Sequence, residues 1–161
     1  MCLHGPKIDF MKKNIILLIE DDELDVISVK RSLKRLNTDY ELFTAYNGIE
    51  ALEMLRGKGD EPPMQPLPNL ILLDLNMPKM NGIEFLKMLR SDSSLKHIKV
   101  FVMTTSGEDN DRKVTESLGV SGYLIKPLNF NNNNKRSDSM DAFVQFHVGK
   151  IFRDEAQVKT V

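Results

Sequence analysis

Short runs of almost entirely apolar residues constrain the fold of this chain more than any other feature. The clearest runs are residues 14–19 (NIILLI), 69–73 (NLILL) and 98–104 (IKVFVMT). A strand that is apolar at nearly every position has no polar face to turn toward water, so it suits a parallel sheet covered on both sides. We therefore expect these runs to be the central strands of such a sheet.

Amphipathic patterns separate these runs. We predict helices over residues 24–37, 47–55, 83–90 and 108–118, and two further strands over residues 40–45 and 122–125. In the first helix, Val26, Val29 and Leu33 recur at helical spacing, with lysines and arginines on the other faces. The alternation of strands and helices predicts an α/β fold, in which a doubly wound, five-stranded parallel sheet carries helices on both faces.

The two ends of the chain differ from this alternating region. Residues 1–13 show no regular pattern, and we predict an irregular leader there. One folded domain is expected over residues 14–156, with an asparagine-rich linker at 131–138 and a tail at 157–161. A last helix is predicted from an apolar stripe formed by Met140, Phe143, Val144, Val148, Ile151 and Phe152. His147 lies on this stripe, and we expect it to be a core residue.

The composition excludes several classes of function. The 22 basic and 23 acidic residues leave a net charge of −1, so a broad basic face for nucleic acid or anionic lipid is not expected. The single cysteine rules out an intramolecular disulfide and suits the cytoplasm. The longest apolar run has five residues, too few to cross a membrane. No helix-turn-helix pattern follows residue 152, so we expect no DNA-binding output domain.

Polar residues that could bind a ligand or take part in a reaction follow the predicted strands. They are Glu20, Asp21, Asp22, Glu23 and Asp25 after the first strand, Asp74 after the run at 69–73, Thr104, Thr105 and Ser106 after the run at 98–104, and Lys126 after the last strand. The carboxyl ends of parallel strands meet at one edge of a sheet, where such folds bind ligands. Clustered carboxylates need a cation, and ligands that are all oxygens favour Mg²⁺.

Each of these residues also has an ordinary explanation. An acidic run often begins a helix, Asp74 suits a turn, and Thr104 and Lys126 suit a strand end and a surface. Their joint occurrence at four strand ends favours a site instead. A carboxylate beside a divalent cation is able to accept a phosphoryl group and form an aspartyl phosphate, a reaction that needs mainly alignment and charge compensation.

Four motifs of the sequence resemble the receiver domains of two-component response regulators, of the CheY-like type. They are residues 17–22 (LLIEDD), 72–82 (LLDLNMPKMNG), 103–106 (MTTS) and 122–127 (GYLIKP). The resemblance covers residues 14–130 and implies a flavodoxin-like fold with strand order 2-1-3-4-5. It also implies phosphorelay signalling, in which a sensor histidine kinase or a phosphotransfer protein donates a phosphoryl group and the domain switches a protein-binding surface.

The resemblance also implies a role for individual residues. Asp74 is the expected phosphoacceptor, and Mg²⁺, with Mn²⁺ as a substitute, is expected to bind Glu20, Asp21, Asp74 and the backbone carbonyl of Asn76. Thr104 and Lys126 are expected to bind the phosphoryl group, and Thr104 and Tyr123 to form the switch. A cis peptide is expected before Pro127. Residues expected to tune dephosphorylation are Asn76, Thr105 and Ser106, with the bulk of Thr105 slowing exchange with small donors.

The long loop at residues 57–68, together with the motif NMPKMNG, resembles the single-domain receivers that accompany phytochrome-type and hybrid kinases. Expected partners are the phosphoryl donor, an unidentified downstream protein and, as an option, a weak homodimer. Three other functions stay open: a receiver-fold scaffold independent of phosphorylation, a Mg²⁺ phosphohydrolase of the haloacid-dehalogenase type, and a flavin protein. A phosphohydrolase of this type requires a second acidic residue at the position of Asn76. Flavin binding requires a loop rich in glycine and hydroxyl residues at the position of Glu20 and Asp21, where negative charge would repel the flavin phosphate.

Overall fold

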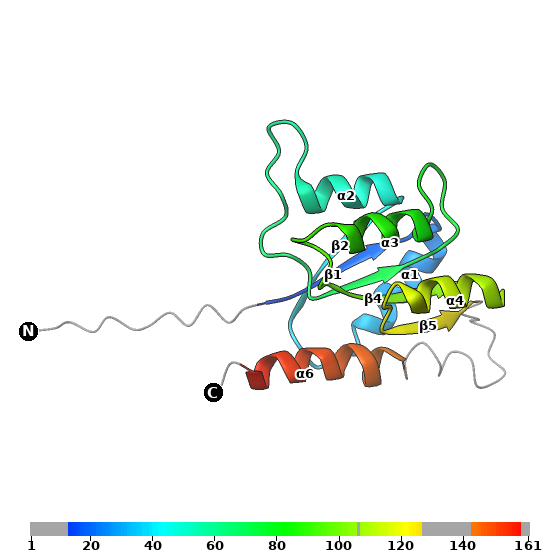
Figure 1. The fold of residues 1–161 in the computed structure, drawn as a ribbon. Coiled ribbons are helices and arrows are strands. Elements are labelled where there is room, and N and C mark those ends of the chain that lie inside the picture. Colours follow the sequence, from blue (N-terminus) through cyan, green and yellow to red (C-terminus); the bar gives the residue numbers. More distant parts are fainter. Residues whose placement is uncertain (1–12, 106, 127–142, 159–161) are drawn as a thin grey trace, which may run out of the picture.

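A parallel sheet of five strands forms the centre of the molecule (Figure 1). A computed structural model describes residues 13–105, 107–126 and 143–158. In chain order the strands are β1 (Asn14–Ile19), β2 (Tyr40–Ala45), β3 (Leu70–Leu73), β4 (Lys99–Thr104) and β5 (Gly122–Ile125). Their order in the sheet is β2-β1-β3-β4-β5, and every neighbouring pair is parallel. The predicted fold class and strand order are confirmed.

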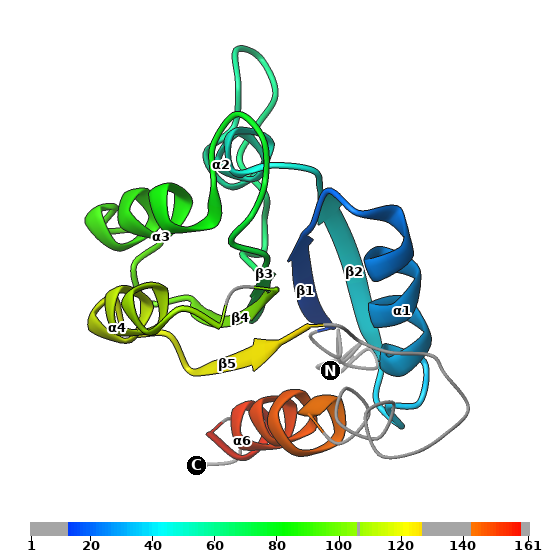
Figure 2. The same cartoon turned by 90° about the vertical axis from the view of Figure 1, so that its right-hand side faces the viewer.

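Helices cover both faces of the sheet (Figure 2). They are α1 (Glu23–Leu33), α2 (Gly48–Arg56), α3 (Gly82–Ser91), α4 (Asp109–Ser117) and α6 (Gly149–Val158), the last preceded by a π-helix, η1 (Val144–Val148). Helices α1 and α6 pack on one face, and α2 and α3 pack on the other. The apolar residues of β1 and β3 are almost completely buried, as two covered faces require.

Local sequence signals set the beginnings of the helices. The Asn47 side chain accepts a hydrogen bond from the Glu50 amide and begins α2, as predicted. Asn81 and Glu84 form a reciprocal capping box that begins α3. The first helix ends at Leu33, before the predicted end at residue 37. The chain tightens there into i→i−3 hydrogen bonds, while Leu36 remains buried against the same core.

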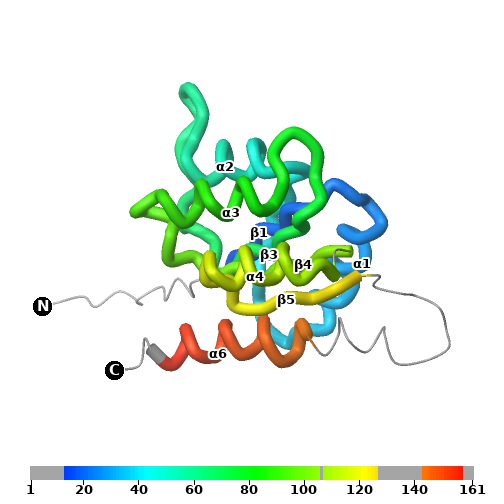
Figure 3. Tube along the Cα trace, turned by 45° about the vertical axis from the view of Figure 1, so that its right-hand side comes forward, coloured from blue at the N-terminus to red at the C-terminus, as the bar shows by residue number. Residues whose placement is uncertain are grey.

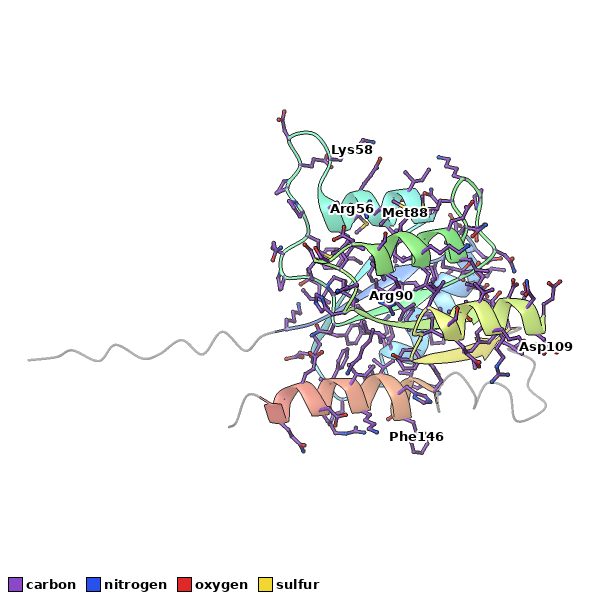
Figure 4. The ribbon with its side chains drawn as sticks, viewed as in Figure 1. Arg56, Lys58, Met88, Arg90, Asp109 and Phe146 are labelled. Atoms are coloured by element: carbon purple, nitrogen blue, oxygen red, sulfur yellow. The ribbon has the colours of Figure 1, made fainter. Side chains whose placement is uncertain are left out.

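The last helix buries the predicted apolar stripe, as far as the structure describes it, against β4 and α1. The expectation that His147 is a core residue is wrong, because its side chain is exposed. The turn of η1 places Val144 and Val148 toward the core, and the His147 ring lies beside them against Phe101 and Phe143, with centroids 5.3 and 5.1 Å away. Phe146 is 73% exposed and points away from the sheet (Figure 4).

The connection between α2 and β3 projects from the body of the domain (Figure 3). It contains a cis peptide between Gln65 and Pro66. The cis peptide expected before Pro127 lies outside the described residues, as do Ser106, Met140, the linker at 131–138 and residues 1–12 of the predicted leader. Helix α6 continues to Val158, past the predicted domain end at residue 156. No helix in the described part of the chain is long and apolar enough to cross a membrane.

Candidate functional site

The carboxyl ends of four strands bring the predicted site residues together. Glu20 follows β1, Asp74 follows β3, Thr104 ends β4 and Lys126 follows β5. Backbone hydrogen bonds extend the sheet into the site: the Asp74 amide donates to the Ile19 carbonyl at 3.0 Å, and the Lys126 amide donates to the Thr104 carbonyl at 2.7 Å. The register of the sheet therefore fixes the backbone at Asp74 and Lys126.

Three carboxyl groups converge at this edge. One carboxylate oxygen from each of Glu20, Asp21 and Asp74 lies within 4.8 Å of the other two. Glu20 and Asp74 are buried, whereas Asp21 is exposed, so the cluster is open to solvent on one side. Oxygen ligands at this spacing suit a hard divalent cation such as Mg²⁺, which retains water on its open side. The residues present therefore fit the expected metal.

Lys126 supplies the positive charge of the site. Its side chain is 4% exposed, and its ammonium donates to Glu20 Oε2 at 2.5 Å and to Asp25 Oδ2 at 2.7 Å. Asp74 Oδ1 lies farther away, at 3.8 Å. Asp25 belongs to the acidic run expected at this edge of the sheet, but no individual role was predicted for it. Its position in the first turn of α1 did not single it out, because acidic residues are common there without a partner.

Burial shifts the pKa values of these groups. It raises the pKa of Glu20 to about 8, against the opposing hydrogen bond from Lys126 and with a further contribution from the Asp74 charge. Burial likewise raises the pKa of Asp74, opposed by the Lys126 charge. Burial alone would lower the pKa of Lys126, but its hydrogen bonds to Asp25 and Glu20 raise it overall. The site therefore disfavours several bare carboxylates, and a cation would stabilise their ionised forms.

Asn76 connects the loop after β3 to the end of β4, beside Asp74. Its backbone amide donates to Asp74 Oδ1 at 3.3 Å. Its side-chain amide donates to the buried Thr104 hydroxyl at 3.3 Å and to the exposed Thr105 hydroxyl at 3.2 Å. The loop after β3 is thus joined to the end of β4, next to the expected phosphoacceptor.

Tyr123 lies on β5, half-buried against the core formed with α3. The guanidinium of Arg112, from α4, lies 5.8 Å from the centre of its ring. The Tyr123 ring thus connects β5 to α4 through Arg112. Its backbone pairs in register with Val102 of β4, two residues before Thr104. This neighbourhood suits the expected switch role, which stays a prediction.

The conformation of the β3–α3 loop explains the glycine that ends the motif at residues 72–82. A Cβ atom at Gly82 would lie 2.4 Å from the Asp74 carbonyl oxygen, so a glycine is needed where α3 begins. Lys79 has a φ of 65°, a conformation that non-glycine residues seldom adopt. The loop borders a pocket of about 430 Å³ whose lining includes Asp21, Asn76 and Asp111. This pocket therefore lies beside Asp21, the exposed member of the carboxylate cluster.

Comparison with known proteins agrees with this geometry. Residues 16–136 match the family described as "Response regulator receiver domain". Response regulator Rcp1 of Synechocystis sp. is 38% identical over 129 residues, which cover 80% of this chain and 87% of Rcp1. The crystal structure of the Mn²⁺-bound form of Rcp1 superposes with a TM-score of 0.73 at 35% identity, covering 83% of this chain and 93% of that one. The phosphorylated cyanobacterial phytochrome response regulator RcpA gives a TM-score of 0.74 at 31% identity, with coverages of 86% and 96%.

Proposed function

This chain belongs to the family of response regulator receiver domains, and we propose that Asp74 is the residue on which it carries a phosphoryl group. Phosphorylation is the standard mechanism of this family, and histidine kinases phosphorylate its members. The observation that carries the assignment to Asp74 is its position: a buried carboxyl at the end of β3, among Glu20 and Asp21 and 3.8 Å from the Lys126 ammonium.

Receiver domains bind Mg²⁺ at an acidic pocket, and in this chain we assign the ligands to Glu20, Asp21, Asp74 and the backbone carbonyl of Asn76. Mn²⁺ is the proposed substitute, which the Mn²⁺-bound form of Rcp1 supports. When bound, the cation supplies positive charge to the oxygens of the transferred group.

The chain's own residues then act on the phosphoryl group. A carboxylate oxygen of Asp74 bonds to phosphorus while the phosphorus–nitrogen bond to the donor histidine breaks, which leaves an aspartyl phosphate. Lys126 and the Thr104 hydroxyl bind phosphoryl oxygens, so charge on the transferring group is compensated from the β4–β5 side. The Thr104 hydroxyl accepts from the Asn76 side-chain amide, and a hydroxyl that accepts one hydrogen bond can still donate its own O–H to a phosphoryl oxygen. Thr104 and Tyr123 together switch the surface that binds a downstream protein.

We propose a phytochrome-type sensor kinase as the ultimate phosphoryl donor, either directly or through a phosphotransfer protein. The similarity to RcpA, a phytochrome response regulator, supports this choice. We further propose that the protein acts in the cytoplasm on protein partners, with self-phosphorylation and self-dephosphorylation as its only chemistry. Asn76 at the second position after Asp74 argues against a haloacid-dehalogenase type of phosphohydrolase, which wants an acid there.

Incubation with Mg²⁺ and acetyl phosphate, followed by intact-protein mass spectrometry, tests the assignment. The wild-type chain is expected to gain the mass of one phosphoryl group, and Asp74→Asn is expected to gain none. Asp21→Asn serves as a second variant, which should slow incorporation through loss of the cation without removing the acceptor. Equal incorporation in the wild type and in Asp74→Asn would contradict Asp74 as the acceptor.

A further inference from the structure

We propose that Asp25 is a positioning residue that holds the ammonium of Lys126 in place for the phosphoryl group on Asp74. The inference rests on the proposed function, and it adds a residue from α1 to a site otherwise built from the strand ends. The carboxylate of Asp25 lies 2.7 Å from Lys126 Nζ, within the range of a strong charge-assisted hydrogen bond.

Within the described part of the chain, the hydrogen bonds of Lys126 leave one of its N–H donors for the reacting group. An ammonium has three N–H donors. Glu20 and Asp25 accept one each, at 2.5 and 2.7 Å, and Asp74 Oδ1 lies 3.8 Å away, beyond hydrogen-bond distance. Two carboxylates therefore fix the lysine head. A phosphoryl group added to Asp74 would bring its oxygens into the gap that the third donor faces.

Asp25 is itself held firmly. It lies in the first turn of α1, where the Asp22 side chain accepts hydrogen bonds from the Leu24 and Asp25 amides at 2.8 and 3.2 Å. The neighbouring Val26 packs into the core between α1 and the sheet. The positive end of the helix dipole also favours a carboxylate in this turn. Because its side chain is only 24% exposed, water screens the Asp25–Lys126 contact less than it would at an open surface.

Asp25 differs from Glu20 in its relation to the metal. Glu20 belongs to the group of three carboxyls that fit a divalent cation, and Asp25 does not. A cation at that group draws the charge of Glu20 toward itself and weakens its hold on Lys126. Asp25 then becomes the main acceptor that keeps the ammonium beside Asp74. Its contribution is therefore expected to be largest in the state that binds both metal and phosphoryl group.

Beryllofluoride, which mimics a phosphoryl group on a carboxylate, provides the test at saturating Mg²⁺. We compare the wild type, Asp25→Asn, Asp25→Glu and the control Glu23→Gln, which removes an exposed carboxylate from the same turn of α1. Loss of one charged hydrogen bond is expected to weaken beryllofluoride binding about tenfold in Asp25→Asn. Glu23→Gln should remain within about twofold of the wild type, and Asp25→Glu should recover part of the loss.

A second readout reports on the lysine itself. In the wild type, the buried and hydrogen-bonded Lys126 NH₃⁺ group is expected to give a ¹⁵N resonance protected from rapid exchange. Asp25→Asn should broaden or remove this signal while circular dichroism and the backbone spectrum stay native, a result that a general loss of structure would not give. An unchanged Nζ signal, or beryllofluoride binding equal to or tighter than the wild type, would overturn the inference. A wild type that binds no beryllofluoride, and yet keeps an Asp25-dependent Nζ signal, would instead contradict the proposed function.

Discussion

The ammonium of Lys126 lies closer to Glu20 than to Asp74, at 2.5 Å from Glu20 Oε2 against 3.8 Å from Asp74 Oδ1. Glu20 is also one of the three clustered carboxyls, with Asp21 and Asp74, that fit a divalent cation. The same buried carboxylate thus serves two positive partners, one belonging to the chain and one supplied by solution. Mg²⁺ and the Lys126 ammonium must share or compete for its charge.

Removal of the Lys126 charge is therefore expected to strengthen metal binding while it impairs phosphorylation. In Lys126→Met the carboxylates lose their competing cation, and Mg²⁺ affinity should rise on the order of tenfold. Beryllofluoride binding at saturating Mg²⁺ should fall, because the ammonium no longer meets the phosphoryl mimic. Isothermal titration calorimetry measures both. Lys99→Met, at the amino end of β4, is the control, and it should change neither affinity. Weaker Mg²⁺ binding in Lys126→Met would contradict the competition.

Mg²⁺ affinity is expected to depend on pH through Glu20. Burial raises the pKa of Glu20 to about 8, so below that pH the cation must displace a proton. Affinity should rise from pH 6 to pH 8, by at most about tenfold per unit for one proton. Glu20→Gln should lose this slope. An identical slope in the variant would show that another group titrates.

The raised pKa of Glu20 also makes the free energy of unfolding depend on pH. The folded pKa of Glu20 lies above the ordinary value of 4.5, so the unfolded chain binds fewer protons between pH 4.5 and about 8. The free energy of unfolding in the presence of chelator should therefore decrease as pH rises through this range. Urea titrations of the wild type and Glu20→Gln measure the difference, and Mg²⁺ should restore stability at pH 8 in the wild type alone.

The sheet and the main site residues were predictable because they depend on short-range patterns. Apolar runs identify strands that are buried on both faces, and the polar residue after each run lies at the same edge of a parallel sheet. Glu20, Asp21, Asp74 and Lys126 all follow such runs, so their proximity is predictable from the sequence. The side-chain contacts among them were not predictable, since they depend on distances of a few ångströms across separate elements.

Two particular misses have physical causes. Asp25 resembles any acidic residue in the first turn of a helix, where a carboxylate is favourable without a partner. Only the packing of α1 against the sheet shows that it reaches Lys126. His147 falls on an apolar stripe when the last helix is assumed to be regular. The π-helical turn at Val144–Val148 changes the positions of its residues, and no pattern in the sequence predicted that turn.

Thr105 is expected to limit phosphorylation by small donors. Its exposed side chain stands beside Thr104, and its hydroxyl accepts a hydrogen bond from Asn76 at 3.2 Å. Thr105→Ala removes both bulk and hydrogen bond, and phosphorylation by acetyl phosphate should become faster. Thr105→Ser removes the methyl group alone, so an equal acceleration would assign the effect to access. Intact-protein mass spectrometry of reactions quenched at set times gives the rates, and slower phosphorylation of Thr105→Ala would refute the prediction.

Gly82 is expected to be required for both stability and the geometry of Asp74. A Cβ atom there would lie 2.4 Å from the Asp74 carbonyl oxygen and 2.7 Å from Leu75 Cα, and backbone atoms cannot move aside as a flexible side chain can. The Gly82 amide also donates to the Leu75 carbonyl at 3.0 Å, which ties the start of α3 to the loop that follows β3. Gly82→Ala should therefore lower the free energy of unfolding by about 1–3 kcal/mol, measured with urea.

Gly107→Ala is the matched control, because the nearest atom to its added Cβ is Ile125 Cδ1 at 4.0 Å. This variant should change the free energy of unfolding by less than about 0.5 kcal/mol. Gly82→Ala should also weaken beryllofluoride binding under conditions where the variant is fully folded, because displacement of the Asp74 backbone moves its carboxyl away from Lys126. Native stability together with unchanged beryllofluoride binding in Gly82→Ala would mean that the β3–α3 loop adapts without moving Asp74, and that glycine at this position serves neither purpose.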